Sequence, residues 1–249
     1  MFFSIVIATF NSEKFINQTL NSIKSQNFKN FELVIVDKNS TDKTIDIIKK
    51  YKFKNIKIIR KNDKGIYDAL NIGIRNSKGI VISILHSNDK FFKKNVLKDV
   101  YFTFKLNNVD IVYGDLVYYD TKMKSVLRYW KSGNFKNFSF NKGWSPPHPS
   151  FFVKKKIYLK HGLYKTNIGT SSDIELMHRF LQKKKISFKY LNKILIKMRY
   201  GGKSNESIRT IINQNIKIIK FLKLNSLYKI IYYLVNKFLN RTNQFLKRP

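Results

Sequence analysis

Residues 5–113 alternate short apolar runs with segments of helical spacing, and this alternation constrains the fold more than any other feature. The apolar runs are rich in Ile, Val and Phe and occupy residues 5–8, 31–36, 56–59, 80–85 and 110–113. Helical spacing covers residues 15–23, 45–48 after a predicted N-cap at Ser40, 66–75 and 96–106. Strands that alternate with helices of this length predict an α/β fold with a mostly parallel central sheet flanked by helices.

Polar residues follow three of the predicted strands. They are Thr9-Phe10-Asn11, Asp37 and Ser87-Asn88-Asp89. Ligands of open α/β sheets bind beyond the carboxyl ends of the strands, so these residues are candidates for one binding site. Each of them taken alone is also typical of a cap or turn residue.

The segment Asp63–Asn71, with the sequence DKGIYDALN, is harder to explain by helix formation alone. Gly65 permits a tight backbone approach, and Lys64 precedes it. Tyr67, Asp68 and Asn71 then place aromatic and polar groups at the start of a helix, where an anion or sugar hydroxyls can be held. We therefore expect this segment to contact a ligand.

Taken together with later segments, these parts of the chain resemble the family 2 glycosyltransferases, which have the nucleotide-diphospho-sugar-binding GT-A fold. The resemblance spans roughly residues 3–205 and is most similar to bacterial members that build exopolysaccharide, O-antigen or colanic-acid-like units. It is carried by the order and spacing of its parts: SIVIATFNSEKF, FELVIVDKNSTDKT, DKGIYDALNIGI, SKGIVISILHSND, PPHPSFF, SSDIEL and GGKS. It implies a Rossmann-like, mostly parallel sheet that binds a nucleotide-sugar donor.

The resemblance assigns donor-side roles to the residues after the strands. Thr9, Asn11 and Asp37 match positions that line the base and ribose pocket, and Asp89 matches the acid that holds a divalent cation, Mg or Mn, on the donor diphosphate. The remaining donor-binding candidates are Phe10, Lys64, Gly65, Tyr67, Asp68, Asn71, Ser87 and Asn88. Lys38 stands where the family often has a second acid, which leaves the nucleotide open, with a UDP-sugar as the expected donor.

Asn88 is a departure from the acidic pair that many of these enzymes carry at the metal site. An amide oxygen can still coordinate a cation or accept a sugar hydroxyl, but it brings no charge. The sequence therefore predicts a one-acid metal site with weaker metal binding.

The second half of the chain supplies the acceptor side in this interpretation. His148 lies between prolines in Trp144–Ser150 and is expected to bind the donor phosphates or the acceptor. Asp173 is the predicted general base, with Glu175 as the alternative, although either is also typical of a helix N-terminus. Arg199 and Lys203 match a late loop and are expected to steady the leaving phosphates.

The predicted activity is metal-assisted, inverting transfer of a sugar to a saccharide or lipid-linked acceptor in surface polysaccharide synthesis. Residues 1–206 are expected to form the GT-A domain, with 1–115 on the nucleotide side and 116–206 on the acceptor side. Residues 207–249 are expected to form a basic helical extension. The lack of a secretory signal pattern at the N-terminus predicts a cytoplasmic protein.

Positive charge is concentrated in the second half. Residues 1–120 carry 20 Lys and Arg against 12 Asp and Glu, whereas residues 121–249 carry 29 against 3. In residues 207–249, apolar positions recur at helical spacing among lysines. This pattern fits helices packed on the domain or on another subunit, and equally a segment lying on an anionic membrane at the inner face of the plasma membrane.

Two other classes of protein remain compatible with the sequence. A GT-A protein that binds a nucleotide without catalysis, or scaffolds a partner transferase, would fit Asn88 and Lys38. A nucleic-acid-binding protein would fit the positive charge. No recognised nucleic-acid-binding motif accompanies that charge, so we expect no nucleic-acid partner. The absence of cysteine excludes disulfides and thiolate metal sites. The sequence gives no indication of oligomeric state.

Overall fold

The computed structural model describes residues 1–122, 124–201 and 208–246. Within these residues the strands are β1 (Phe3–Thr9), β2 (Phe31–Asp37), β3 (Ile56–Arg60), β4 (Val81–Ile84), β5 (Lys90–Phe91), β6 (Ile111–Tyr119), β7 (Val126–Trp130), β8 (Phe151–Lys154) and β9 (Phe188–Arg199). The α-helices are α1 (Ile16–Lys24), α2 (Thr44–Lys50), α3 (Ile66–Asn76), α4 (Val96–Asn107), α5 (Lys155–His161), α6 (Ser172–His178), α7 (Ile208–Leu222) and α8 (Leu227–Leu246). The shorter helical turns are η1 (Ser139–Lys142), η2 (His148–Ser150), η3 (Thr166–Ser171) and η4 (Arg179–Lys183).

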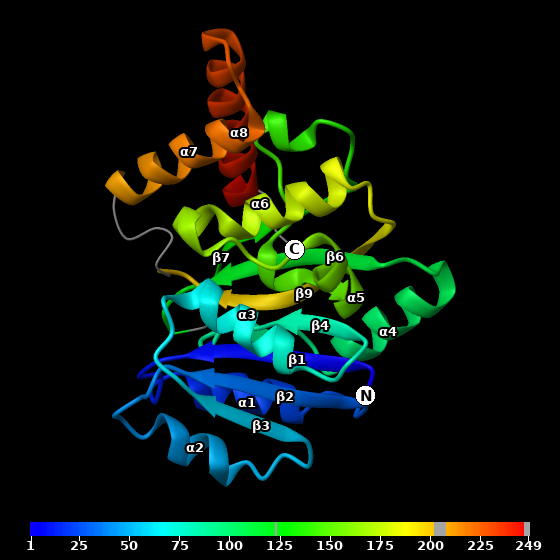
Figure 1. Ribbon diagram of the computed structural model, residues 1–249, viewed down its shortest axis with the longest axis vertical. Helices are drawn as coiled ribbons and strands as arrows, with labels where there is room; N and C mark the ends of the chain where they lie inside the picture. Colours follow the sequence, from blue (N-terminus) through cyan, green and yellow to red (C-terminus); the bar gives the residue numbers. More distant parts are fainter. Residues whose placement is uncertain (123, 202–207, 247–249) are drawn as a thin grey trace.

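All the described strands join one sheet in the order β3-β2-β1-β4-β8-β6-β9-β5, with β7 paired to β6 (Figure 1). Strands β3, β2, β1 and β4 run parallel, β8 is antiparallel to both of its neighbours, and β9 is parallel to β6. The chain thus has the predicted α/β architecture with a mixed, mostly parallel sheet. The strand order reverses direction at β1, where ligands of such sheets bind.

Alternate residues of each parallel strand pack into two separate apolar layers. Ile5 and Ile7 of β1 are fully buried against the layer that contains α1 and α4, while Val6 packs with α3. This period of two is what a strand buried on both faces requires. The helices therefore cover both faces of the sheet, with α1 and α3 on opposite sides (Figure 1).

The predicted N-cap at Ser40 was wrong. Helix α2 begins at Thr44, with Lys43 in the capping position and no side-chain cap. The Ser40 hydroxyl instead donates to the Asp37 carboxylate. A buried carboxylate accepts a stronger hydrogen bond than a free helix N-terminus offers, so Ser40 belongs to the loop beyond β2.

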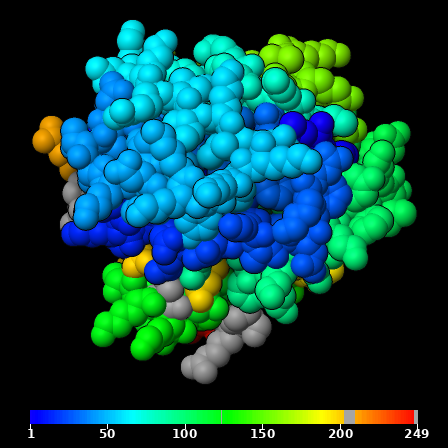
Figure 2. Space-filling model, turned by 90° about the horizontal axis from the view of Figure 1, so that it is seen from below, coloured from blue at the N-terminus to red at the C-terminus, as the bar shows by residue number. Residues whose placement is uncertain are grey.

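The C-terminal extension is helical, as expected, and packs on the rest of the chain. Ile218 and Leu222 of α7 and Tyr233 of α8 are buried in the same layer as α6. The two helices lie at the end of the molecule opposite α2 and β3 (Figure 1). Viewed from that other end, the surface is formed mostly by the first half of the chain, in blue and cyan (Figure 2). No described helix is long and apolar enough to span a bilayer.

Candidate active site

The loops after β1 and β2 are tied together around the Asp37 carboxylate. Asp37 is fully buried, and its oxygens accept from the Ser40 hydroxyl, from the Ser40 backbone N–H at 2.9 Å and from Arg60 Nε at 3.3 Å. The Ser40 hydroxyl in turn accepts from the Asn11 backbone N–H at 2.9 Å. Asp37 therefore lies at the end of β2, as the sequence predicts. It also holds the loop that contains Asn11, through the Ser40 hydroxyl.

Thr9, Phe10 and Asn11 differ in what they offer to a ligand. Thr9 is buried and its hydroxyl has no hydrogen-bond partner. The ring of Phe10 is 54% exposed, which is unusual for a residue that directly follows a buried strand. Asn11 has a φ of 44°, and its side-chain oxygen accepts from the Thr41 N–H at 3.0 Å. The Phe10 ring is thus the apolar group that this loop presents to solvent.

A second loop, before α3, is held by its own carboxylates. The Gly65 N–H donates to Asp63 at 2.9 Å, and the Lys64 N–H donates to Asp68 at 3.0 Å. Gly65 has a φ of 122°, a backbone conformation that residues other than glycine rarely adopt. Asp63 also lies 3.9 Å from the Lys38 ammonium, which links this loop to the end of β2.

Helix α3 then reaches across to the second half of the chain. Asn71 uses its whole amide on the backbone of Tyr164, donating at 2.8 Å and accepting at 2.9 Å. One turn earlier, the Tyr67 hydroxyl donates to the carbonyl of Thr170 at 3.3 Å. The predicted ligand-binding segment thus brings Tyr67 to the Asp173 region, while Asn71 serves to position Tyr164.

The Ser87-Asn88-Asp89 segment lies beside the β1 loop, where the Ser87 and Ser12 hydroxyls are 3.0 Å apart. Thr19 of α1 holds the segment by donating to the carbonyls of Ser87 and Asp89 at 2.9 and 2.7 Å. The Asp89 carboxylate is fully buried, and neither oxygen has a hydrogen-bond partner among the described residues. Burial raises its pKa well above the ordinary range, an effect that the nearby backbone and guanidinium of Arg199 oppose.

An unpartnered buried carboxylate fits a cation-binding role, because a divalent ion supplies the compensation that the protein does not. No cluster of three or more His, Asp or Glu occurs among the described residues. A cation at Asp89 would therefore take its other ligands from the Asn88 amide oxygen, from water and from a bound phosphate.

Asp173 is the second residue of α6 and is half-buried. Burial raises its pKa to about 6, although hydrogen bonds, among them that of the Ile174 N–H at 2.7 Å, and the Lys237 charge oppose the shift. Burial raises the pKa of the Tyr118 hydroxyl in the first place, and the charges of Asp89 and Asp173 both add to that rise. A carboxylate with a pKa near 6 is suited to accept a proton at neutral pH.

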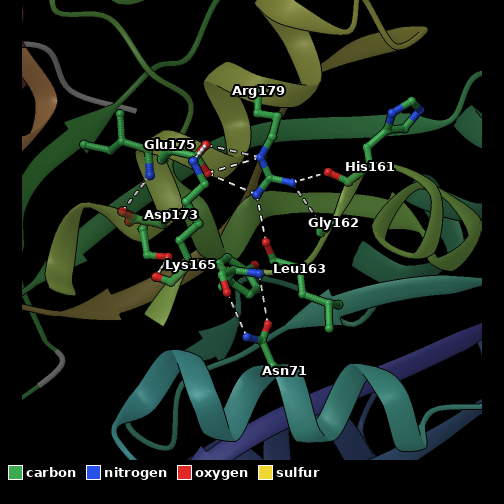
Figure 3. Close-up of polar contacts among 11 residues, drawn as sticks. Asn71, His161, Gly162, Leu163, Lys165, Asp173, Glu175 and Arg179 are labelled. Carbon is green, nitrogen blue, oxygen red and sulfur yellow. Dashed lines mark hydrogen bonds and ion pairs between the residues drawn. The ribbon is translucent and has the colours of Figure 1, made fainter. Parts of the chain in front are cut away.

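Glu175, the alternative base, forms ion pairs with two cationic side chains (Figure 3). Arg179 lies 3.1 Å and Lys165 2.9 Å from its oxygens. Although burial works against ionisation, hydrogen bonds from these two cations lower the pKa of Glu175. Arg179 also donates to the carbonyls of His161, Gly162 and Leu163. Glu175 therefore anchors the backbone before α6, and Asp173 is the better candidate for a base.

His148 is buried in η2, with Nε2 2.6 Å from the Tyr164 hydroxyl and its ring 5.9 Å from that of His86. Burial lowers the pKa of His148 to about 3 and that of His86 to about 4. Both imidazoles are thus neutral at pH 7. His148 can exchange hydrogen bonds with a ligand but offers phosphates no positive charge.

The structure places Arg199 at the end of β9, next to Asp89. Its guanidinium donates to the Thr121 carbonyl and lies 4.5 Å from the centre of the Phe15 ring. The pairing of β5 with β9 brings the two residues together, since Lys90 is opposite Lys197. Lys203, the other predicted phosphate contact, lies outside the described residues.

Sequence reasoning missed Arg60, Tyr164 and Lys237. Arg60 ends β3 and is therefore at the same sheet edge as Asp37, so the strand-end rule that found Asp37 could have found it as well. Tyr164 connects Asn71 to His148 but follows no strand or motif that marks it. Lys237 lies in the tail, where nothing in the local sequence indicates contact with the site.

Comparisons with known proteins agree with this geometry. The family model described as Glycosyl transferase family 2 matches residues 4–166. A mycobacterial PGL/p-HBAD biosynthesis glycosyltransferase, from Mycobacterium tuberculosis, is 27% identical over 208 residues, which are 82% of this chain and 79% of the relative. The poly(ribitol-phosphate) beta-N-acetylglucosaminyltransferase TarS of Staphylococcus aureus is 38% identical over 104 residues, which are 40% of this chain. The matched part is only 18% of TarS.

Solved structures share the fold. The S. aureus TarS 1–349 complex with UDP-GlcNAc has a TM-score of 0.68 at 21% identity, covering 100% of this chain and 76% of that one. The Pyrobaculum calidifontis mannosyltransferase in complex with GDP-Man and Mn2+ has a TM-score of 0.66 at 15% identity, covering 97% and 73%. Because the family model spans more than half of the sequence and the sheet edge carries the expected polar groups, this chain belongs to glycosyltransferase family 2.

Proposed function

We propose that this protein transfers a sugar from a nucleotide-diphosphate donor to a saccharide acceptor. The observation that carries the proposal is the Asp89 carboxylate beyond β4, fully buried and without a hydrogen-bond partner among the described residues, together with Asp173 of α6, whose pKa burial raises to about 6. Family membership supports it, as does the similarity to TarS, which is named an N-acetylglucosaminyltransferase and has been solved with UDP-GlcNAc. We expect the transferred sugar to be a hexosyl or N-acetylhexosaminyl group.

The donor nucleotide is assigned to the edge formed by the loops after β1 and β2. There the exposed Phe10 ring can stack on a base, and the unpartnered Thr9 hydroxyl and the Asn11 loop are close by. Asp37 already accepts three hydrogen bonds, so its main contribution is to hold this loop in place. A UDP-sugar remains the proposed donor.

Asp89, with Asn88 beside it, is proposed to hold Mg or Mn on the donor diphosphate. When bound, the cation neutralises negative charge that develops on the departing diphosphate. Arg199 lies beside Asp89 and adds positive charge to the same position. The Mn2+ in the solved mannosyltransferase complex supports a divalent ion in this fold.

Asp173 is proposed to accept the proton of the acceptor hydroxyl. The acceptor oxygen forms a bond to the anomeric carbon as the bond from that carbon to the β-phosphate oxygen breaks. The electron pair of the broken bond leaves with the nucleoside diphosphate. Attack from the face opposite the leaving group would invert the configuration at the anomeric carbon.

The reaction is tested by nucleoside diphosphate release from UDP-GlcNAc, UDP-glucose and GDP-mannose with Mn2+ and a mixed polysaccharide acceptor. Turnover is expected with one of these donors. Asp173→Asn removes the base, and Asp46→Asn, on the exposed face of α2, is the control for loss of one acidic charge. A protein that binds a donor but never turns it over would instead be a non-catalytic member of the family.

The acceptor is proposed to be lipid-linked and reached at an anionic membrane surface. Helix α8 buries Tyr233 but exposes an apolar face on its other side, formed by Leu227, Tyr228, Ile231, Tyr232, Leu234, Val235, Phe238 and Leu239. Residues 207–249 carry nine Lys and Arg and no acid. An exposed apolar stripe beside cations is typical of helices that lie in a lipid interface.

A second copy of the chain fits this face less well, because a symmetric contact would place two acid-free segments against each other. Charge favours lipid instead, with about 1 kcal/mol per Lys or Arg at an anionic surface. The test is sedimentation with phosphatidylserine vesicles of wild type, Ile231→Glu/Phe238→Glu and the charge-matched Asn213→Glu/Asn225→Glu. Binding is expected to fall with salt and to fall further in the first variant than in the second. Equal loss in both variants would refute insertion of the apolar face.

A further inference from the structure

A cavity of about 110 Å³ lies between the C-terminal half of α8 and the loops that follow β7 and η1. Its wall includes Trp130 and Trp144, which are the two tryptophans of the chain. Asn240, Asn243 and Gln244 face it from α8. Aromatic faces beside side-chain amides are the groups that recognise a saccharide, because the ring packs on apolar C–H faces and the amides bond to hydroxyls.

The walls of the cavity are held in place before any ligand binds. Trp144 Nε1 donates to the Ser132 carbonyl at 2.7 Å, and the Trp130 ring stacks with Tyr118 at 6.5 Å between centroids. Gly143 has a φ of 67°, and a Cβ at this position would come within 2.6 Å of the Lys237 backbone. Helix α8 therefore presses directly on the loop and closes this side of the cavity.

Two of the three side-chain amides on α8 that line the cavity make hydrogen bonds within the protein, and the third makes none among the described residues. Gln244 accepts from Arg128 Nε at 2.7 Å, and Asn240 donates to the Lys142 carbonyl at 3.1 Å. Asn243 is exposed and makes no hydrogen bond within the described residues. A free amide that lines a cavity offers both a donor and an acceptor to sugar hydroxyls.

The cavity is close to the acceptor side of the proposed reaction. Trp144 lies four residues before His148, and Lys237, one turn before Asn240, acts electrostatically on Asp173. No carboxylate lines the cavity, while Lys131 does. Its surroundings thus accept neutral or anionic saccharides.

We propose that this cavity is a binding subsite for a saccharide unit of the acceptor, with Trp130, Trp144 and Asn243 as its contacts. The assignment of the bound sugar as acceptor rests on the proposed glycosyl transfer.

The test uses intrinsic tryptophan fluorescence of the full chain without any nucleotide, since both tryptophans line the cavity. N-acetylglucosamine, galactose and lactose are the probes, with glycerol as the control. A saturable change is expected with at least one sugar, with about fivefold to tenfold weaker affinity in Asn243→Ala, as loss of one or two hydrogen bonds implies. Asn213→Ala, on the exposed side of α7, should bind as wild type does.

The site is overturned if none of the three sugars gives a saturable change, or if Asn243→Ala binds as tightly as wild type. Trp130→Phe and Trp144→Phe locate the signal, and a response that persists fully in both contradicts the site. Failure of the proposed function is distinguishable, because donor turnover is measured separately. Turnover without a fluorescence response defeats the subsite alone, and a response without turnover of any donor defeats the transferase assignment alone.

Discussion

Asp173 and Glu175 are two residues apart, yet their surroundings give them opposite properties. Within the part of the chain that the structure describes, Asp173 lacks an ion pair, and burial raises its pKa to about 6, whereas two cations lower the pKa of Glu175. The sequence predicted Asp173 as the base and kept Glu175 as the alternative. The spacing of Glu175 and Arg179, four residues apart on a helix, was visible and is the signal that would have decided the choice.

The first prediction concerns the pH dependence of the rate. Because the base acts when ionised, kcat should rise with pH through about 6 and level off above pH 7. Asp173→Asn should lower kcat by about 100-fold or more and remove this rise. The measurement is the pH profile of nucleoside diphosphate release in both proteins, and an unchanged profile in the variant would exclude Asp173 as the base.

The Asp173 carboxylate also makes the stability of the folded protein depend on pH. Its pKa is higher in the folded protein than the ordinary 3.8, so its contribution to stability is complete below pH 3.8 and is lost as pH rises through about 6. Asp173→Asn should therefore not destabilise the protein at pH 7.5. Urea unfolding at that pH should give a midpoint equal to or above that of wild type.

The second prediction concerns Glu175→Gln, which should lower stability more than catalysis, the reverse of Asp173→Asn. The change weakens the contacts with Arg179 and Lys165 and leaves a buried cation poorly paired, which should destabilise the protein by about 1–3 kcal/mol. Activity per folded molecule should fall much less than in Asp173→Asn. Urea unfolding together with kcat measures both effects, and a variant that loses catalysis at full stability would reverse the assignment of the two carboxylates.

At the scale of elements, continuous apolar runs in the first half made the parallel strands predictable, because both faces of β1, β2 and β4 are covered. The start of α2 was not predictable, since Ser40 has equal intrinsic preference for a cap and for a strand-end loop. Tertiary contact with Asp37 decided it. The pairing of β8, β6, β9 and β5 depends on contacts between distant segments that no local pattern records.

Helix α8 provides the third prediction, which concerns Lys237. Its ammonium donates to Asn215 at 2.6 Å, and its charge lowers the pKa of Asp173. Removing that charge in Lys237→Met should shift the acid limb of the pH profile to a pH above about 6. Lys229→Met, an exposed lysine of the same helix, is the matched control and should leave the profile in place. An identical profile in all three proteins would show that α8 does not influence the base.

At the scale of the whole molecule, a single sheet extends through both halves of the chain, and the loop after β4 and helix α6 supply Asp89 and Asp173. Family resemblance predicted the fold, which the structure confirms, whereas the donor edge and the roles of both carboxylates stay predictions. It could not predict that the tail packs through Tyr233 beside the Trp144 loop, because the motifs end before residue 207. The tail is basic and amphipathic in sequence, but only its packing shows which face is buried.

The central claim is that Asp89 holds a divalent cation against the diphosphate of a nucleotide sugar. The most direct measurement is calorimetric titration of UDP-GlcNAc into wild type and Asp89→Asn, each with and without Mn2+. Asn has the shape of Asp, and removing a buried carboxylate that has no partner should leave the fold intact. We expect Mn2+ to strengthen binding to wild type by about tenfold or more, which is about 1.4 kcal/mol, and not to strengthen binding to the variant. Equal strengthening by Mn2+ in both proteins would contradict the account.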